Sequence, residues 1–221
     1  MSHPPHTPRL LPASAVQPTG PVDHPDWNYR PVLGRVQRLR FRMVVDLLGG
    51  DRFDRILEIG YGSGVFQPEL ARWCRELHGI DAHPLTGEVA GRLAQHGVTT
   101  TLTRGSAEAL PYDDRFFDCV VAVSTLEYVE SIDTACREID RVLAPGGSLI
   151  VVTPGASALW SPVLAVATRQ GASQYGDRRQ RLQPALYRHF RPEREVRVPR
   201  FGGSVLRLYT GLRLRAGGTA A

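Results

Sequence analysis

Three glycines at alternate positions, Gly60, Gly62 and Gly64, follow a short apolar run that contains the acid Glu58. Glycine permits a sharp backbone turn, and because it has no Cβ it lets a ligand approach backbone N–H groups closely. A second acid, Asp81, stands 21 residues after Gly60. At the end of a neighbouring strand, such a carboxylate can accept hydrogen bonds from the hydroxyl groups of a ribose. The pattern predicts a nucleoside-binding site; a tight turn without a ligand is the alternative.

The spacing of these glycines separates two kinds of nucleoside site. A dinucleotide-binding loop has the pattern GxGxxG, whose third glycine allows close helix packing beside a pyrophosphate. Counted from Gly60, that glycine would be residue 65, which is Val65. The loop instead reads GxGxG and follows Glu58. It therefore favours a nucleoside cofactor other than a nicotinamide dinucleotide.

Short β-branched runs alternate with helical patterns around this loop, which is typical of a parallel sheet with helices on both faces. Continuous apolar runs at 120–123 and 149–152 indicate the centre of that sheet. Two alternating segments separated by Gly202-Gly203 predict an antiparallel hairpin. Strands are expected at 55–59, 78–81, 98–103, 118–124, 148–153, 195–200 and 204–209, and helices at 31–48, 66–77, 85–96 and 131–143.

Length and composition limit the class of protein. The chain has 221 residues, of which 42% are hydrophobic and 22% charged, enough for one compact domain. We expect a flexible Pro-rich arm over 1–26 and a single domain over 27–221. No apolar stretch reaches the ~20 residues of a membrane span. Three cysteines without a CxxC pair favour neither a disulfide framework nor a metal site. These features predict a cytoplasmic protein without a bound metal.

From 55 to 154, near half of its length, the chain resembles the class I S-adenosylmethionine-dependent methyltransferases, whose first motif is an acid followed by GxGxG. The segments 105–112 and 137–147 are also similar to motifs of that family. The resemblance implies a Rossmann-like three-layer α/β sandwich, with a mostly parallel seven-stranded sheet that ends in the antiparallel hairpin. It implies S-adenosylmethionine as cofactor, held by Glu58, Gly60, Tyr61, Gly62, Gly64, Asp81, Ala82, Ser106, Ala107, Glu108 and Ser124.

The resemblance also assigns parts of the cofactor to parts of the chain. The glycine loop would lie against the methionine part, Asp81 would hold the ribose, and the segment 105–112 would hold the adenine. Ser106 stands where many members have an Asp that accepts a hydrogen bond from the adenine amino group. Because a serine oxygen can also accept that bond, though more weakly, the departure affects cofactor affinity rather than cofactor identity.

The reaction implied is the displacement of a methyl group from a sulfonium by a nucleophile that approaches in line. Holding the nucleophile in this geometry is worth ~7–11 kcal/mol. A base is also needed when the acceptor must lose a proton. Glu127, which follows the strand predicted at 118–124, is the candidate base. A solvated surface glutamate is the alternative.

Acceptor selection is expected from the N-terminal helix 31–48 and from an insert over 155–192, which would together cap the acceptor side of the domain. The candidate acceptor-binding residues are Trp27, Tyr29, Tyr128, Trp160 and Tyr175. Aromatic walls beside arginines favour a small-molecule acceptor that is flat or apolar and carries a carboxylate or phosphate. The alternative is a solvated helix face in an arginine-rich chain.

The charge distribution leaves other functions open. Residues 169–221 hold 12 arginines and 3 acids. Such a segment can contact nucleic acid, or it can pack against the acidic middle of the chain. A tRNA or rRNA methyltransferase is therefore an alternative, although no Asn-Pro-Pro-Tyr-like motif follows the strand at 118–124. A regulator that binds the cofactor without catalysis, and lipid methylation at a membrane surface through the helix 31–48, are further alternatives. The sequence does not predict the oligomeric state.

Overall fold

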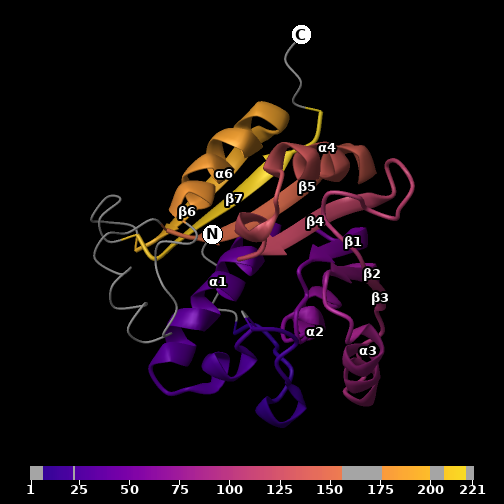
Figure 1. Ribbon diagram of the computed structural model, residues 1–221, viewed down its shortest axis with the longest axis vertical. Coiled ribbons are helices and arrows are strands. Elements are labelled where there is room, and N and C mark those ends of the chain that lie inside the picture. Colours follow the sequence, from indigo (N-terminus) through magenta and orange to yellow (C-terminus); the bar gives the residue numbers. More distant parts are fainter. Residues whose placement is uncertain (1–6, 22, 156–175, 200–206, 218–221) are drawn as a thin grey trace.

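A computed structural model describes residues 7–21, 23–155, 176–199 and 207–217. Within them, the strands form one seven-stranded sheet of order β3-β2-β1-β4-β5-β7-β6 (Figure 1). The pairs among β1 to β5 are parallel, whereas β7 is antiparallel to both of its neighbours. The strands are β1 Phe53–Ile59, β2 Cys74–Asp81, β3 Thr101–Arg104, β4 Phe117–Val123, β5 Leu143–Pro154, β6 Arg191–Val198 and β7 Tyr209–Arg215. The mostly parallel sheet with an antiparallel end is confirmed.

Helices cover both faces of this sheet (Figure 1). Because alternate residues of a strand point to opposite faces, Leu57 and Ile59 join the core under α4 and α6, whereas Ile56 joins the core under α1 and α2. The described helices are α1 Leu33–Leu48, α2 Gln67–Leu70, α3 Thr86–Gln95, α4 Ile132–Val142 and α6 Gly176–His189, with 3-10 helices at Ala13–Ala15, Pro25–Tyr29 and Leu126–Tyr128. None of these combines the length and the hydropathy needed to cross a membrane. The three-layer Rossmann-like sandwich is confirmed.

The centre of the sheet lies where the apolar runs predict it. The side chains of Val120 in β4 and Leu149 in β5 are completely buried. From β1 the chain builds outward to β2 and β3, then returns to place β4 on the other side of β1. Ligands of open α/β sheets bind at the carboxyl ends of the strands beside such a reversal. The topology therefore places the expected site at the ends of β1 and β4.

The helix predicted over 66–77 is wrong beyond its first turn. α2 ends at Leu70, and β2 already begins at Cys74. Cys74 pairs with Phe53 in the parallel ladder between β2 and β1. This pairing satisfies the backbone N–H and C=O groups of 74–77 within the sheet. The apolar spacing of the segment fits a short helix followed by a turn and a strand as well as it fits one long helix.

The predicted antiparallel pair of strands is confirmed, but its second strand is Tyr209–Arg215 and the described residues 207 and 208 precede it. Gly211 interrupts the apolar pattern of β7, and an interior glycine normally weakens a strand. In the structure, α1 crosses β7 at this point. A Cβ at Gly211 would lie 3.0 Å from Cδ1 of Leu47 and 3.1 Å from Cε of Met43. The glycine therefore permits close packing of α1 on the sheet. The predicted turn at Gly202-Gly203 lies outside the described residues.

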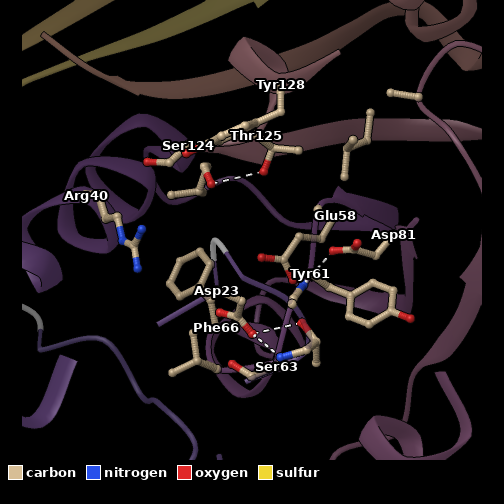
Figure 2. Close-up of a pocket in the computed structure, with 18 of the residues that line it drawn as sticks. Asp23, Arg40, Glu58, Tyr61, Ser63, Phe66, Asp81, Ser124, Thr125 and Tyr128 are labelled. Carbon is tan, nitrogen blue, oxygen red and sulfur yellow. Dashed lines mark hydrogen bonds between the residues drawn. The ribbon is translucent and has the colours of Figure 1, made fainter. Parts of the chain in front are cut away.

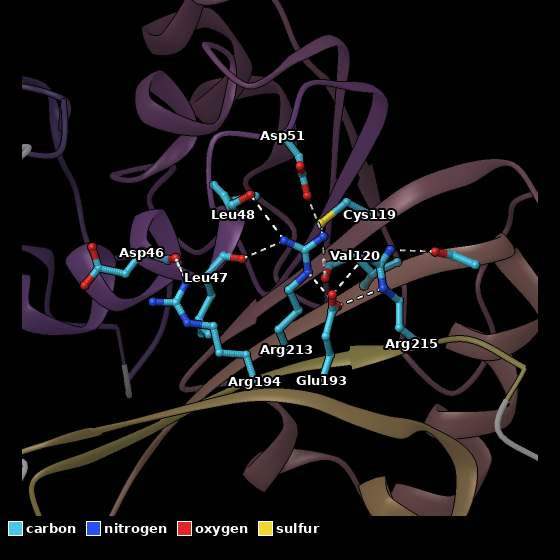
Figure 3. Close-up of polar contacts among 11 residues, drawn as sticks. Asp46, Leu47, Leu48, Asp51, Cys119, Val120, Glu193, Arg194, Arg213 and Arg215 are labelled. Carbon is cyan, nitrogen blue, oxygen red and sulfur yellow. Dashed lines mark hydrogen bonds and ion pairs between the residues drawn. The ribbon is translucent and has the colours of Figure 1, made fainter. Parts of the chain in front are cut away.

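Arg213 of β7 fastens the C-terminal end of α1 to the sheet (Figure 3). Its Nη1 donates hydrogen bonds to the carbonyl groups of Leu47 at 3.0 Å and Leu48 at 3.3 Å. Its Nη2 donates to Oδ2 of Asp51 at 2.6 Å, and its Nε lies 2.9 Å from Oε2 of Glu193. The last carbonyl groups of a helix have no partner within the helix. The buried guanidinium supplies one, and it thereby helps to hold α1 in place.

The flexible arm predicted over 1–26 is described in the structure from residue 7 on, and its residues 7–21 with 23 and 24 form what we call the N-terminal segment. In the structure it lies on the domain. Leu11 and Ala15 are buried. The N–H of Leu11 donates to the carbonyl group of Val65 at 3.1 Å, and the N–H of Arg9 donates to Oε2 of Glu69 at 2.7 Å. These contacts place the segment beside the glycine loop; its mobility in solution stays a prediction.

Candidate active site

The glycine loop joins β1 to α2 and bends as the sequence predicts. Gly60, Gly62 and Gly64 have φ angles of +77°, +51° and +74°, which residues with a Cβ rarely adopt. A Cβ at Gly60 would lie 2.2 Å from Oγ1 of Thr125, and a Cβ at Gly64 would lie 3.0 Å from Cγ1 of Val89 in α3. Gly60 therefore allows the loop after β4 to approach closely, and Gly64 allows α3 to pack against the glycine loop.

Asp81 ends β2 and lies directly beside this loop. Its Oδ2 accepts a hydrogen bond of 2.8 Å from the N–H of Gly62, and its Oδ1 accepts one of 3.3 Å from the N–H of His83. Nε2 of His83 lies 3.0 Å from the carbonyl oxygen of Gly62. The end of β2 therefore holds the middle of the loop through both its backbone N–H and its carbonyl group. The half-buried carboxylate remains on the wall of a cavity.

This cavity, of about 830 Å³, lies between the glycine loop, α1, the N-terminal segment and the loops after β3 and β4 (Figure 2). Its volume is within the range of cofactor and small-molecule sites. Most of the residues predicted for the site line it together: Trp27, Glu58, Gly60, Tyr61, Gly62, Asp81, Ala82, Ser106, Ala107, Glu108, Ser124 and Tyr128. Stretches far apart in the sequence therefore meet at the edge of the sheet that the topology indicates.

The remaining predicted residues do not line the cavity. Glu127 is 2% exposed and lies in the 3-10 helix after β4, outside the cavity wall; its role as a base stays a prediction without support from its position. The hydroxyl group of Tyr29 donates to the carbonyl group of Leu11, so it holds the N-terminal segment. Gly64 faces α3, as described above. Trp160 and Tyr175 lie outside the described residues.

Four charged residues of the cavity were missed from the sequence: Asp23, Arg40, Glu130 and Arg207. Asp23 lies in the Pro-rich segment, 37 residues before Gly60, where no periodicity points to it. The helical pattern of the sequence does single out Arg40. This residue stands four positions after Val36 and four before Val44, on the apolar face of α1. Because a cation on such a face is seldom buried unless it has a partner, its position could have indicated a ligand-binding role.

Carboxyl groups determine the electrostatics near the glycine loop. Burial raises the pKa of Glu58 to about 7, although the hydrogen bond of 2.5 Å from Gln67 favours the anion. Burial also raises the pKa of Asp23, and the charge of Asp81 adds to both effects. The positive charge of Arg40 lowers the pKa of both Glu58 and Asp23, so Arg40 lies within electrostatic range of them. This end of the cavity therefore favours a ligand with a positively charged group.

The segment predicted to hold adenine lines another part of the same cavity. Oγ of Ser106 accepts a hydrogen bond of 3.1 Å from the N–H of Glu108, whose carboxylate accepts one of 2.7 Å from the N–H of Ser131. These bonds fix the turn. Ile80 and Ala107 contribute apolar surface to the wall beside it. Together with the glycine loop and the carboxylate at the end of β2, this arrangement fits the base, the sugar and the amino-acid end of a nucleoside such as S-adenosylmethionine.

Comparisons with known proteins bear on the same region. Residues 57–151 match a family model described as a methyltransferase domain. The chain is 32% identical over 129 residues to the ubiquinone/menaquinone biosynthesis C-methyltransferase UbiE of Vibrio cholerae, which covers 54% of this chain and 48% of the relative. It is 31% identical over 98 residues to the sterol 4-C-methyltransferase strm-1 of Caenorhabditis elegans, which covers 43% and 29%. The chain therefore spans about half, or less, of the length of these curated relatives.

Solved structures share the fold. The N-methyltransferase NodS from Bradyrhizobium japonicum, solved in complex with S-adenosyl-L-homocysteine, superposes with a TM-score of 0.63 and 18% identity over 89% of this chain and 94% of that chain. The sheet order, the glycine loop and the carboxylate at the end of β2 define a Rossmann-like nucleoside-binding domain. Residues 57–151 match the methyltransferase-domain family, so this part of the chain is similar to the class I S-adenosylmethionine-dependent methyltransferases.

Proposed function

We propose that this protein transfers a methyl group from S-adenosylmethionine to a small-molecule acceptor. The observation that carries the proposal is a single cavity that joins the loop at Gly60 and Gly62, the carboxylate of Asp81, and the candidate acceptor residues Trp27 and Tyr128. The relatives named above are a quinone-biosynthesis C-methyltransferase and a sterol C-methyltransferase. Their names support a small-molecule acceptor and favour no nucleic acid.

The cavity offers a suitable partner for each part of the cofactor. Asp81 would accept hydrogen bonds from the ribose hydroxyl groups, and Ile80 and Ala107 would contact the adenine. The glycine loop and the guanidinium of Arg40 would receive the amino-acid end, whose carboxylate pairs well with arginine. When bound, the cofactor supplies an electrophilic methyl group on its sulfonium. The contribution of the chain is to hold donor and acceptor in line, an effect worth ~7–11 kcal/mol.

The wall on the acceptor side supports an acceptor with a flat or apolar body and an acidic group. Trp27 lines the cavity and stacks on His24, with ring centroids 4.3 Å apart. Tyr128, after β4, adds a second aromatic ring. Arg207, just before β7, also lines the cavity, and its buried Nε has no hydrogen-bond partner within the described residues. Aromatic surfaces would hold the body of such an acceptor, and the guanidinium would bind its carboxylate or phosphate.

Much of the positive charge near the C-terminus is paired within the protein. Arg213 and Arg215 both contact Glu193, and Arg188 lies 2.9 Å from Asp133 of α4. This pairing supports the interpretation that the basic part of the chain packs against the protein's own acids. No contact among the described residues specifically favours a nucleic-acid acceptor over a small molecule.

The proposal is tested by incubating the purified protein with methyl-labelled S-adenosylmethionine and an extract of small metabolites. We expect the label to enter a small molecule, the Asp81→Ala variant to lose this activity, and the Asp26→Asn variant, altered at an exposed position, to retain it. Label in tRNA but in no metabolite would favour the nucleic-acid alternative. Saturable cofactor binding with no transfer to either would favour a regulator.

A further inference from the structure

The N-terminal segment reaches the cavity beside the glycine loop. Thr19, Gly20, Asp23 and His24 all line it. Asp23 lies against the middle of the loop, since a Cβ at Gly62 would be 3.4 Å from both Cγ and Oδ1 of Asp23. Figure 2 shows its carboxylate below the centre of the cavity, with the guanidinium of Arg40 across from it. A side chain 37 residues before the first glycine therefore forms part of the same wall as the loop.

The carboxylate of Asp23 has a hydrogen-bond partner on one side only. Its Oδ2 accepts bonds from the N–H of Thr19 at 3.1 Å and from the hydroxyl of Thr19 at 2.9 Å. No ion pair joins it to any residue in the part of the chain that the structure describes. A half-buried anion without a cation costs free energy, which is why burial raises the pKa of Asp23. A cationic ligand group at Oδ1 would remove that cost.

The other two carboxylates near the loop are already engaged. Glu58 accepts the hydrogen bond from Gln67 and is almost completely buried. Asp81 accepts hydrogen bonds from two backbone N–H groups and lies at the ribose position. Asp23 differs in that its Oδ1 faces the middle of the loop and accepts no hydrogen bond among the described residues, because both bonds from Thr19 go to Oδ2. The positive charge of Arg40 also acts on Asp23, and a guanidinium suits the carboxylate of an amino acid.

We propose that Asp23 binds the ammonium group of the amino-acid end of the cofactor, opposite Arg40, which binds its carboxylate. This inference rests on the proposed function, because it takes S-adenosylmethionine as the ligand. It adds a binding residue that lies outside the region matched by the methyltransferase family, residues 57–151. The N-terminal segment then completes the cofactor site. Its backbone bonds to Val65 and Glu69, on the far side of the loop, hold it in position.

Two ligands that differ only at the amino-acid end separate this role from a structural one. S-adenosylhomocysteine carries the amino-acid group, whereas 5′-methylthioadenosine keeps the adenine, ribose and sulfur but lacks it. Their dissociation constants would be measured by calorimetry for the full chain, for Asp23→Asn and for the matched control Asp26→Asn. Asp26 lies three residues further on, is exposed, and pairs with Arg30. The asparagine conserves the size of the side chain and removes its charge.

We expect Asp23→Asn to weaken binding of S-adenosylhomocysteine roughly 10- to 100-fold, as for loss of a hydrogen bond between charged groups. Binding of 5′-methylthioadenosine should change by less than about two-fold, within the range of surface substitutions, and the control should behave as the unaltered chain. Equal losses for both ligands, or no loss for either, would overturn the assignment of Asp23. Failure of the unaltered chain to bind S-adenosylhomocysteine would instead overturn the proposed function.

Discussion

The carboxylate of Asp81, at the end of β2, accepts a hydrogen bond of 2.8 Å from the backbone N–H of Gly62, in the loop that follows β1. The two elements of sequence that point to a nucleoside are thus in direct contact. Because β1 and β2 are parallel neighbours, their carboxyl ends lie at the same edge of the sheet. The acid therefore fixes the loop, and under the proposed function it would also present its carboxylate to the ribose.

Replacement of this acid should affect every ligand that carries the ribose. For Asp81→Ala we expect weaker binding of both S-adenosylhomocysteine and 5′-methylthioadenosine, by about 1–3 kcal/mol, because hydrogen bonds to the sugar are lost. Calorimetry measures both constants. Asp46→Ala, at an exposed position of α1, is the control. An Asp81→Ala protein that binds both ligands as tightly as the unaltered chain would contradict the ribose assignment.

A side chain at Gly60 should disturb the loop. In Gly60→Ala the new Cβ would collide with Thr125, and a φ of +77° is unfavourable for alanine. We expect the folded state to lose about 1–3 kcal/mol and cofactor binding to fall below detection. Urea unfolding and calorimetry measure the two effects. Gly91→Ala is the matched control, because Gly91 lies in α3 with open space around it. We expect alanine at this position to leave the stability of the folded protein unchanged or to raise it. Equal stability and equal cofactor binding of the Gly60→Ala and Gly91→Ala variants would contradict this account of the loop.

Glu58 should make stability depend on pH. Burial raises the pKa of its carboxyl group from 4.5 to about 7 in the folded protein. Between these values the folded state binds more protons than the unfolded state, so stability is fully present below about pH 4.5 and falls as the pH rises to about 7. At ~1.4 kcal/mol per pKa unit, the loss is on the order of 3 kcal/mol.

The Glu58→Gln variant isolates this effect, because all other titrating groups are unchanged. Its stability relative to the original chain should increase across the same pH window and become constant above about pH 7. Urea unfolding of both proteins through that window gives the difference directly. Two stability curves that run parallel from pH 4.5 to 7 would show that Glu58 ionises as freely in the folded protein as in the unfolded chain.

The guanidinium of Arg213 should stabilise the attachment of α1. Arg213→Met removes the hydrogen bonds to the last carbonyl groups of α1, and we expect unfolding to become easier by about 1–3 kcal/mol. Arg215→Met provides the comparison, because Arg215 contacts the same Glu193 from a more exposed position. Exposed ion pairs are worth less than about 1 kcal/mol. Thermal unfolding that shows the same loss in both variants would argue against a special role for Arg213.

The sequence alone predicts the parts of this protein that depend on local rules. The glycine loop needs residues without a Cβ, and the buried strands at 120–123 and 149–152 need continuous apolar runs, so both are visible in the order of the amino acids. The same holds for Asp81, whose distance from the loop follows from the length of one helix and one strand. These features locate the cavity and most of its lining.

Other parts depend on contacts between distant segments and leave a weaker signal. The start of β2 at Cys74 is set by pairing with β1. The position of β7 is set by α1, which needs Gly211 as a place to cross. Asp23 joins the cavity because Leu11 and Tyr29 anchor the N-terminal segment on the domain. Neither composition nor periodicity of residues 7–24 indicates that packing.

The most direct test of the central claim is a crystal structure of the full chain grown with S-adenosylhomocysteine. The account predicts the ribose hydroxyl groups within hydrogen-bond distance of Asp81, and the amino-acid end over the loop from Gly60 to Gly64. A cavity that stays empty at saturating ligand, or a ligand bound elsewhere on the molecule, would contradict it.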